Sequence, residues 1–185
     1  GTVAGNLCNA SPAADGVPAL MVLDAEVELR SASTTRCRPL QEFILGNRKA
    51  AIRPGEIVTA IRVPKVFARG TSAFVKLGAR RYLVISIAMA AVRLAAGPDG
   101  RIMEAAVAVG SCSAVAQRLP ALEAALVGRA ADISLGAAVA TEHLAGLAPI
   151  DDVRGSGEYR IVAAREIIAR ALLGAAGIPE TELAA

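Results

Sequence analysis

The sequence has few of the side chains that build metal centres. It contains one histidine and three cysteines in 185 residues. The cysteines, Cys8, Cys37 and Cys112, are widely spaced and form no C-x-x-C pair. Zinc ligands usually come in closely spaced pairs, and a four-thiolate iron–sulfur cluster needs four cysteines. We therefore expect no metal centre in this chain, and we expect His143 to be packed or half-exposed rather than catalytic.

Aromatic residues are also scarce, at 3% of the chain with no tryptophan. Lysine and arginine outnumber the acids by 20 to 17 and are scattered along the sequence. Single-strand binding uses stacked rings, and duplex binding uses a concentrated basic face. We therefore expect no nucleic-acid partner.

Long apolar runs are absent too. The longest nearly apolar run, residues 82–92, ends at Arg93 and is shorter than the ~20 residues that span a bilayer. No hydrophobic leader is visible, and isolated thiols fit a reducing compartment. The sequence predicts a soluble, cytoplasmic protein without a membrane span.

What the chain does have is a hydrophobic content of 54% against 20% charged residues, which is enough to fold a core. Apolar alternation and turn residues predict strands, with Pro98-Asp99-Gly100 closing a hairpin between the last two. The expected strands cover residues 25–30, 56–63, 72–78, 85–95 and 102–109, and residues 37–45 read as a strand edge followed by a helical turn. Helical spacing predicts helices over 12–23, 120–127, 134–147 and 158–173.

Residues 1–15 hold the densest group of glycine, asparagine and other turn-forming residues. Glycine permits close backbone approach, and successive N–H groups in such a loop make a concavity suited to a pyrophosphate. The alternative is a tight turn capped by Ser11. The segment has neither the dinucleotide-binding G-x-G-x-x-G spacing nor a P-loop. Both interpretations stay open on the residues alone.

Residues 2–15, Thr-Val-Ala-Gly-Asn-Leu-Cys-Asn-Ala-Ser-Pro-Ala-Ala-Asp, resemble the second FAD-binding motif of the molybdenum hydroxylase flavoproteins. These are the FAD-binding medium subunits of xanthine dehydrogenase, carbon monoxide dehydrogenase and related enzymes. The likeness continues through residues 54–57, Pro64, residues 72–76 and Arg80-Arg81, and extends to about residue 173. The family pattern has glycine where this chain has Ala4.

The resemblance implies an α+β fold in two parts. Residues 1–66 would be the C-terminal part of a PCMH-type FAD-binding subdomain, without its N-terminal half. Residues 70–175 would form a domain of three-stranded antiparallel sheet plus helix bundle, followed by a tail at 176–185. The family's first glycine-rich FAD motif has no counterpart here, so we expect the chain to be the later part of a longer subunit.

The resemblance also implies FAD as the cofactor and assigns its contacts. Asp15 would bond a cofactor hydroxyl, since an acid would repel a pyrophosphate. Lys76 would lie near the isoalloxazine ring, where a cation favours the anionic reduced flavin. On the residues alone, Lys76 is interpreted as surface charge. For Tyr82, the alternative to a position against the ring is a core aromatic at a strand end. The full set of implied cofactor-binding residues is Thr2, Val3, Ala4, Gly5 and Asn6 along the phosphate and ribityl region, Asp15, and Val58, Lys76 and Tyr82 at the flavin.

The function implied is electron relay within an oxidoreductase. A large subunit with molybdopterin would pass electrons to 2Fe-2S clusters on a small subunit, and FAD would pass them on to NAD or another acceptor. No paired carboxylates stand out as a general acid and base, so we expect no catalytic residue on this chain. The alternative is a structural or docking module that does not hold FAD by itself.

Overall fold

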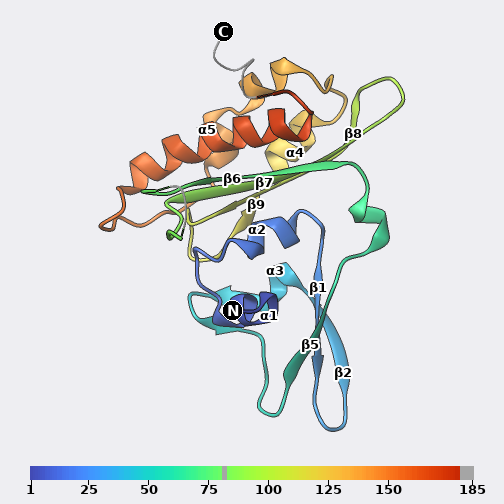
Figure 1. The fold of residues 1–185 in the computed structure, drawn as a ribbon, viewed down its shortest axis with the longest axis vertical. Coiled ribbons are helices and arrows are strands. Elements are labelled where there is room, and N and C mark those ends of the chain that lie inside the picture. Colours follow the sequence, from blue (N-terminus) through green and yellow to red (C-terminus); the bar gives the residue numbers. More distant parts are fainter. Residues whose placement is uncertain (81–82, 180–185) are drawn as a thin grey trace.

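The computed structural model describes residues 1–80 and 83–179, which form an elongated molecule with a helix-covered sheet at one end and a small β structure at the other (Figure 1). The order of elements is α1 (Val3–Asn9), α2 (Gly16–Met21), β1 (Glu26–Arg30), β2 (Thr35–Pro39), α3 (Leu40–Phe43), β3 (Ile44–Gly46), β4 (Lys49–Ala50), β5 (Ile57–Arg62), the 3-10 helix η1 (Lys65–Ala68), β6 (Thr71–Leu77), β7 (Ala88–Ala96), β8 (Ile102–Gly110), β9 (Gln117–Arg118), α4 (Pro120–Leu126), the 3-10 helices η2 (Ile133–Ala138) and η3 (Thr141–Leu144), and α5 (Gly157–Ala175). We call residues 1–62 the lower part and residues 71–179 the upper part.

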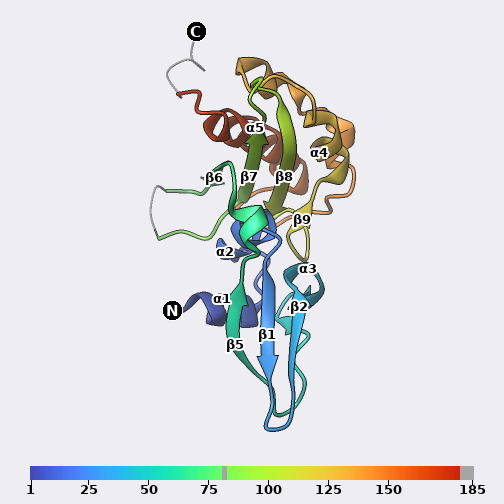
Figure 2. The same ribbon diagram turned by 90° about the vertical axis from the view of Figure 1, so that its right-hand side faces the viewer.

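The lower part is built on the antiparallel sheet β2-β1-β5, with the pair β3-β4 beside it. The alternation in residues 25–30 correctly predicted β1, because Val27 and Leu29 are fully buried while Glu28 between them is partly exposed. Leu7 of α1, Val17 of α2 and Phe43 of α3 cover that buried face and complete the lower core. The helices α1 and α3 contact strands of the lower part, and α2 lies between it and the upper sheet (Figure 2).

The upper part is an antiparallel sheet in the order β6-β7-β8-β9. The expected hairpin is confirmed, since β7 and β8 pair in register with Val92 opposite Val107. Three long strands match the expected sheet, and the two-residue β9 extends its edge. The helix α5 crosses one face and was predicted correctly; Ser156 caps it by accepting a hydrogen bond from Tyr159 N at 3.1 Å. Within the described residues, no helix is both long enough and apolar enough to cross a bilayer.

Both faces of β7 are buried, which explains the long apolar run in the sequence. Ala90, Val92 and Leu94 face α5 and form the upper core with it. Ala91 points the opposite way and belongs to the lower core, together with Ala108 of β8. A strand covered on both faces shows a continuous apolar sequence rather than alternation. Figure 1 shows α5 on one side of the sheet and α2 on the other.

Two helix predictions were wrong. Residues 12–13 form a turn, and the helix expected over 12–23 begins only at Gly16, which places Pro18 in its first turn, where a missing N–H costs least. The helix expected over 134–147 is replaced by the two short 3-10 helices η2 and η3. Gly136 and the β-branched Val139 and Thr141 weaken a long α-helix there. His143 is half-buried, and its Nδ1 accepts a hydrogen bond from Ala140 N at 3.1 Å.

An ion pair ties the β2 strand to the turn before β5. The guanidinium of Arg36 donates from Nε and Nη2 to the two carboxylate oxygens of Glu56, each at 2.7 Å. Arg53 N donates to Glu56 Oε2 at 2.8 Å. These bonds, the one from Arg36 first, lower the pKa of Glu56 to about 2.

This shift predicts a pH effect on stability. Because the pKa of Glu56 is lowered on folding, its contribution is complete above the ordinary value of 4.5 and is lost as the pH falls toward 2. We expect Glu56→Gln to lower the free energy of unfolding at pH 7 and to flatten its decline between pH 5 and 2, measured by urea denaturation at each pH. An unchanged slope in the variant would contradict the assignment; Glu42→Gln, on an exposed carboxylate, is the control.

Candidate functional site

The predicted phosphate-binding residues form a helical turn rather than an open loop. Thr2 caps α1, with Oγ1 accepting from Gly5 N at 3.0 Å, and Asn6 N donates to Thr2 O at 3.0 Å. A methyl group on Gly5 would lie 2.9 Å from Thr2 Oγ1, so glycine is the residue that leaves room for this cap. The expectation of a glycine loop with free N–H groups was therefore wrong at two positions, because the Gly5 and Asn6 donors are used within the chain.

The turn that follows matches the other interpretation offered by the sequence. Ser11 Oγ accepts from Ala13 N at 3.2 Å, and Ala14 N donates to Ser11 O at 3.0 Å. This tight turn delivers Asp15 to the start of α2. Asn6 lies close by, since a methyl group on Gly16 would be 3.2 Å from its Oδ1.

Asp15 occupies the N-cap position of α2 but makes no capping hydrogen bond. A side-chain cap from aspartate is typically worth about 1 kcal/mol. Instead, Oδ2 of Asp15 accepts from Lys76 Nζ at 2.5 Å, and Oδ1 accepts from Ser86 Oγ at 2.6 Å. The carboxylate is therefore oriented by two residues far along the chain and not by its own helix.

Lys76 and Ser86 come from neighbouring segments of the upper part. Lys76 lies on β6, is half-buried, and also donates from Nζ to Val84 O at 2.8 Å. Ser86 lies just before β7 and is 1% exposed. Nothing in the sequence pairs either residue with Asp15, although Ser86 stands out as the single polar side chain between Leu83 and Val92.

The remaining predicted residues are placed as follows. Thr2, Val3, Ala4 and Gly5 lie at the start of α1, and Val58 lies on β5 opposite Leu29, half-buried against the lower core. Tyr82 lies outside the described residues. The structure thus joins Asn6, Asp15 and Lys76 around the start of α2, with Ser86 as an unpredicted fourth member. We call Asp15, Lys76 and Ser86 the carboxylate cluster.

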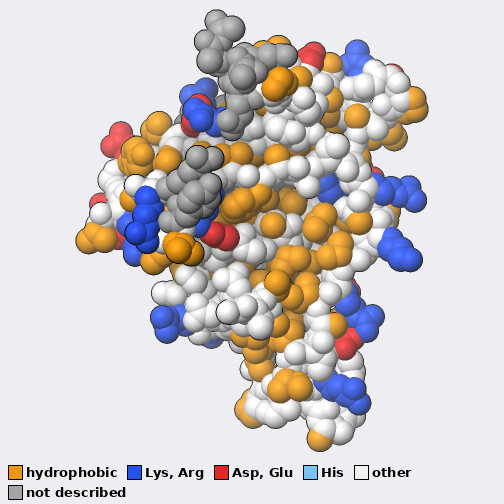
Figure 3. All heavy atoms as spheres, viewed as in Figure 1, with side chains coloured by type: hydrophobic (Ala, Val, Ile, Leu, Met, Phe, Trp, Pro, Cys, Tyr) orange, Lys and Arg blue, Asp and Glu red, His pale blue; other side chains and the backbone are white. Residues whose placement is uncertain are grey.

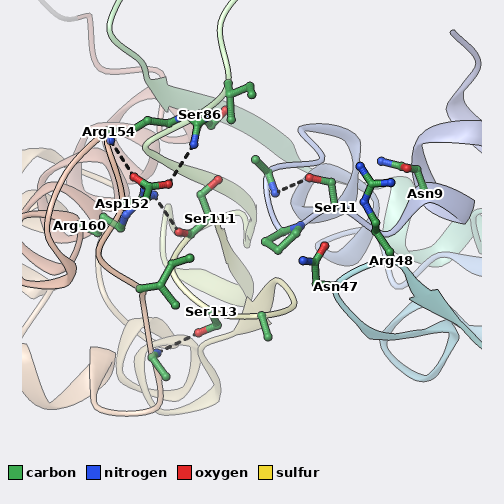
Figure 4. A pocket seen from close by; sticks show the side chains of 16 residues that line it. Asn9, Ser11, Asn47, Arg48, Ser86, Ser111, Ser113, Asp152, Arg154 and Arg160 are labelled. Carbon is green, nitrogen blue, oxygen red and sulfur yellow. Dashed lines mark hydrogen bonds and ion pairs between the residues drawn. The ribbon is translucent and has the colours of Figure 1, made fainter.

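A cleft of about 480 Å³ lies beside this cluster, between the lower and upper parts (Figure 4). Its polar side chains fall on two sides: Asn9, Ser11, Asn47 and Arg48 come from the lower part, and Ser86, Ser111, Ser113, Asp152, Arg154 and Arg160 from the upper part. On the face shown in Figure 3, the arginine and lysine side chains are spread around the edges and form no single basic patch.

Arg160 fixes the upper wall of the cleft. It is buried, and it donates to Ile87 O at 2.5 Å, to Ser111 O at 3.2 Å and to Asp152 Oδ1 at 2.7 Å. The backbone N–H of Arg154 and, after it, the guanidinium of Arg160 lower the pKa of Asp152. Arg160 Nε and Ser111 Oγ are buried without a hydrogen-bond partner among the described residues. The terminal nitrogens of Arg160 are therefore committed to the protein itself.

No thiol or metal chemistry emerges from the described part of the chain. It holds no group of three or more His, Cys, Asp or Glu side chains placed to bind a metal ion. Burial raises the pKa of the Cys112 thiol to about 11 and also raises that of Cys8, so both stay protonated at neutral pH. Cys8 packs half-buried against the lower core.

Two family patterns match the sequence. Residues 1–66 match the FAD binding domain in molybdopterin dehydrogenase, and residues 73–175 match the CO dehydrogenase flavoprotein C-terminal domain.

Individual proteins are similar over nearly the whole chain. The alpha subunit of the 6-hydroxypseudooxynicotine dehydrogenase complex from Paenarthrobacter nicotinovorans is 30% identical over 93% of this chain. The carbon monoxide dehydrogenase medium chain from Afipia carboxidovorans is 35% identical, also over 93%. Solved structures of a Cu,Mo-CO dehydrogenase and of quinoline 2-oxidoreductase from Pseudomonas putida 86 match with TM-scores of 0.85 and 0.86, at 30% and 26% identity, over 97% and 96% of this chain. The chain spans 58 to 62% of the length of each of these four proteins.

The two ion pairs beside the cleft, Lys76–Asp15 and Arg160–Asp152, should contribute unequally to the free energy of unfolding. Lys76→Met breaks a partly exposed pair and is expected to cost less than about 1 kcal/mol. Arg160→Met leaves the carbonyls of Ile87 and Ser111 without their buried donor and removes one of the donors to Asp152, and it is expected to cost about 3 kcal/mol. Urea denaturation of the two variants measures the difference, and equal losses would show that Arg160 does not carry the wall of the cleft.

Proposed function

Because the chain belongs to the family of FAD-binding medium subunits of molybdenum hydroxylases, we propose that it relays electrons through FAD as a subunit of an oxidoreductase complex. Electrons would arrive from 2Fe-2S clusters on a small subunit, which are filled from a molybdopterin-containing large subunit. They would leave from the flavin to NAD or another acceptor. Substrate oxidation would then take place on the large subunit, and no residue of this chain would need to break a substrate bond.

The observation that carries this proposal is the carboxylate cluster, because its free bonding positions suit a flavin. A carboxylate offers about four acceptor positions. Among residues 1–80 and 83–179, the Asp15 carboxylate accepts one bond from Lys76 and one from Ser86. Acceptor capacity therefore remains for a cofactor hydroxyl. Lys76 has three N–H donors, of which Asp15 and Val84 O take two. Among the described residues no acceptor takes the third N–H, which would be available to a flavin ring.

FAD supplies the one- and two-electron chemistry that amino-acid side chains lack. The chain's residues would bind it and tune it. Asp15 would hold a hydroxyl of the cofactor, and Lys76 would favour negative charge on the reduced ring. Thr2, Val3, Ala4, Gly5 and Asn6 would follow the phosphate and ribityl region, and Val58 and Tyr82 would border the ring.

The division of labour between the two parts follows the same proposal. Residues 1–66 would form part of a FAD-binding subdomain, and residues 70–175 would form the flavoprotein C-terminal domain with 176–185 as a tail. The carboxylate cluster lies where these two segments meet. Asp15 comes from residues 1–66, and Lys76 and Ser86 come from residues 70–175. A flavin bound by Asp15 and Lys76 would therefore contact both parts.

A FAD titration tests the proposal. We expect FAD to bind to a form of the protein that includes the coding sequence upstream of Gly1, and to bind less tightly to the 185-residue chain. Asn6→Ala in the longer form should weaken binding about tenfold, through a lost hydrogen bond to the cofactor. Flavin fluorescence quenching measures the Kd.

Asn47→Ala is the matched control, because Asn47 is an exposed asparagine of the lower part on the wall of the cleft. It should leave the Kd unchanged. If the longer form binds no FAD, or if Asn6→Ala and Asn47→Ala behave alike, the residue assignment fails. A colourless protein that still binds the large subunit would favour the docking module.

A further inference from the structure

We propose that Ser86 is a positioning residue for FAD binding. Its hydroxyl holds the carboxylate of Asp15 in the orientation that binds the cofactor. This inference rests on the proposed function and adds to it a residue outside the predicted set. Ser86 itself would not touch the flavin. Its effect on the cofactor would pass entirely through Asp15.

The first support is the environment of the Ser86 hydroxyl. Ser86 is 1% exposed within an otherwise apolar segment, and its Oγ lies 2.6 Å from Asp15 Oδ1. A buried hydroxyl that donates to a carboxylate makes a charge-assisted bond, which is stronger than one between neutral groups. By contrast, the buried Ser111 Oγ has no partner among the described residues. Burial of a serine in this region therefore does not by itself supply a partner.

The second support is the way in which Asp15 is held. Its two oxygens are bound by different residues, Oδ1 by Ser86 and Oδ2 by Lys76. The terminal torsion of aspartate is broad, so one bond alone leaves the carboxylate free to rotate. The helix α2 supplies no restraint, because Asp15 makes no capping bond to it. Ser86 thus fixes the plane of the carboxylate, and through it the remaining acceptor positions.

The third support is the rigidity of the segment that carries Ser86. Ile87 N donates to Leu77 O at 2.8 Å, and Ile87 O accepts from the buried Arg160 at 2.5 Å. Two residues before Ser86, Val84 O accepts from Lys76 Nζ at 2.8 Å. Backbone contacts on both sides therefore hold Ser86 in place. A binding group is positioned accurately when its supporting residues are themselves fixed in this way.

A double-mutant cycle on the FAD-binding form of the protein tests the inference, with the Kd for FAD and the thermal midpoint as readouts. We expect Ser86→Ala to raise the Kd about fivefold and Asp15→Ala to raise it about twentyfold. If Ser86 acts only through Asp15, Ser86→Ala should change the Kd less than twofold in the Asp15→Ala background. Ser134→Ala, which removes an exposed hydroxyl that does not line the cleft, should leave the Kd unchanged.

A second pair of variants separates the hydroxyl from the shape of the side chain. Ser86→Thr and Ser86→Val are nearly equal in size, and only the threonine keeps a donor. Threonine should bind FAD more tightly than valine by about the same fivefold factor. This comparison decides the matter if Ser86→Ala fails to fold.

Two outcomes would overturn the inference without touching the proposed function. In the first, the wild type binds FAD, and Ser86→Ala and Asp15→Ala change the free energy of FAD binding additively. The other is equal affinity in the threonine and valine variants with a lowered thermal midpoint in both, which would make Ser86 a packing residue. Failure of the wild type to bind FAD in any form would overturn the proposed function, and this inference with it.

Discussion

A strand that is buried on both faces has no solvent side, and β7 is such a strand. Its side chains alternate between the upper core under α5 and the lower core over α2. Because the two cores share this strand, the lower part cannot move away from the sheet without exposing Ala91 and Ala108 to water. The relative position of α2 and β6 follows from this shared burial. So does the meeting of Asp15 with Lys76, which joins residues 61 positions apart in the chain.

Each side chain of the carboxylate cluster lies in a local environment that would be unfavourable without the other two. Asp15 forgoes the cap of α2, and Ser86 places a hydroxyl in an apolar segment. Lys76 lies half-buried on a strand, where a lysine is normally solvated. Each choice is unfavourable in isolation. Together they satisfy one another and leave acceptor and donor positions that point to no partner within the described protein.

The sequence predicted the parts of the fold that depend on local pattern. Alternation found β1 and β5, and the Pro98-Asp99 turn found the β7–β8 hairpin. It failed where a tertiary contact or a single residue overrides the pattern. Pro18 delays the start of α2, and Thr2 converts an apparent glycine loop into a capped helical turn.

The site was predictable only in part, for the same reason. Asp15 and Lys76 were named from a family resemblance, but nothing in their spacing shows that they touch. The involvement of Ser86 depends on a hydrogen bond across 71 positions of sequence. Such a contact is set by the packing of the sheet against α2, which no local pattern encodes.

The alanines on the lower face of the sheet also bear on how this protein can diverge. Ala91, Ala106 and Ala108 are all at most 2% exposed, and a methyl group on Gly110 would come within 3.0 Å of Pro18. Larger residues at any of these positions would push α2 away from the strands. The opposite face, packed with leucine, isoleucine and valine, can exchange one large side chain for another. Substitutions in related chains should therefore be tightly limited on the α2 side of β7 and β8 and tolerated on the α5 side, because the small residues keep α2, and with it Asp15, at a fixed distance from the strands.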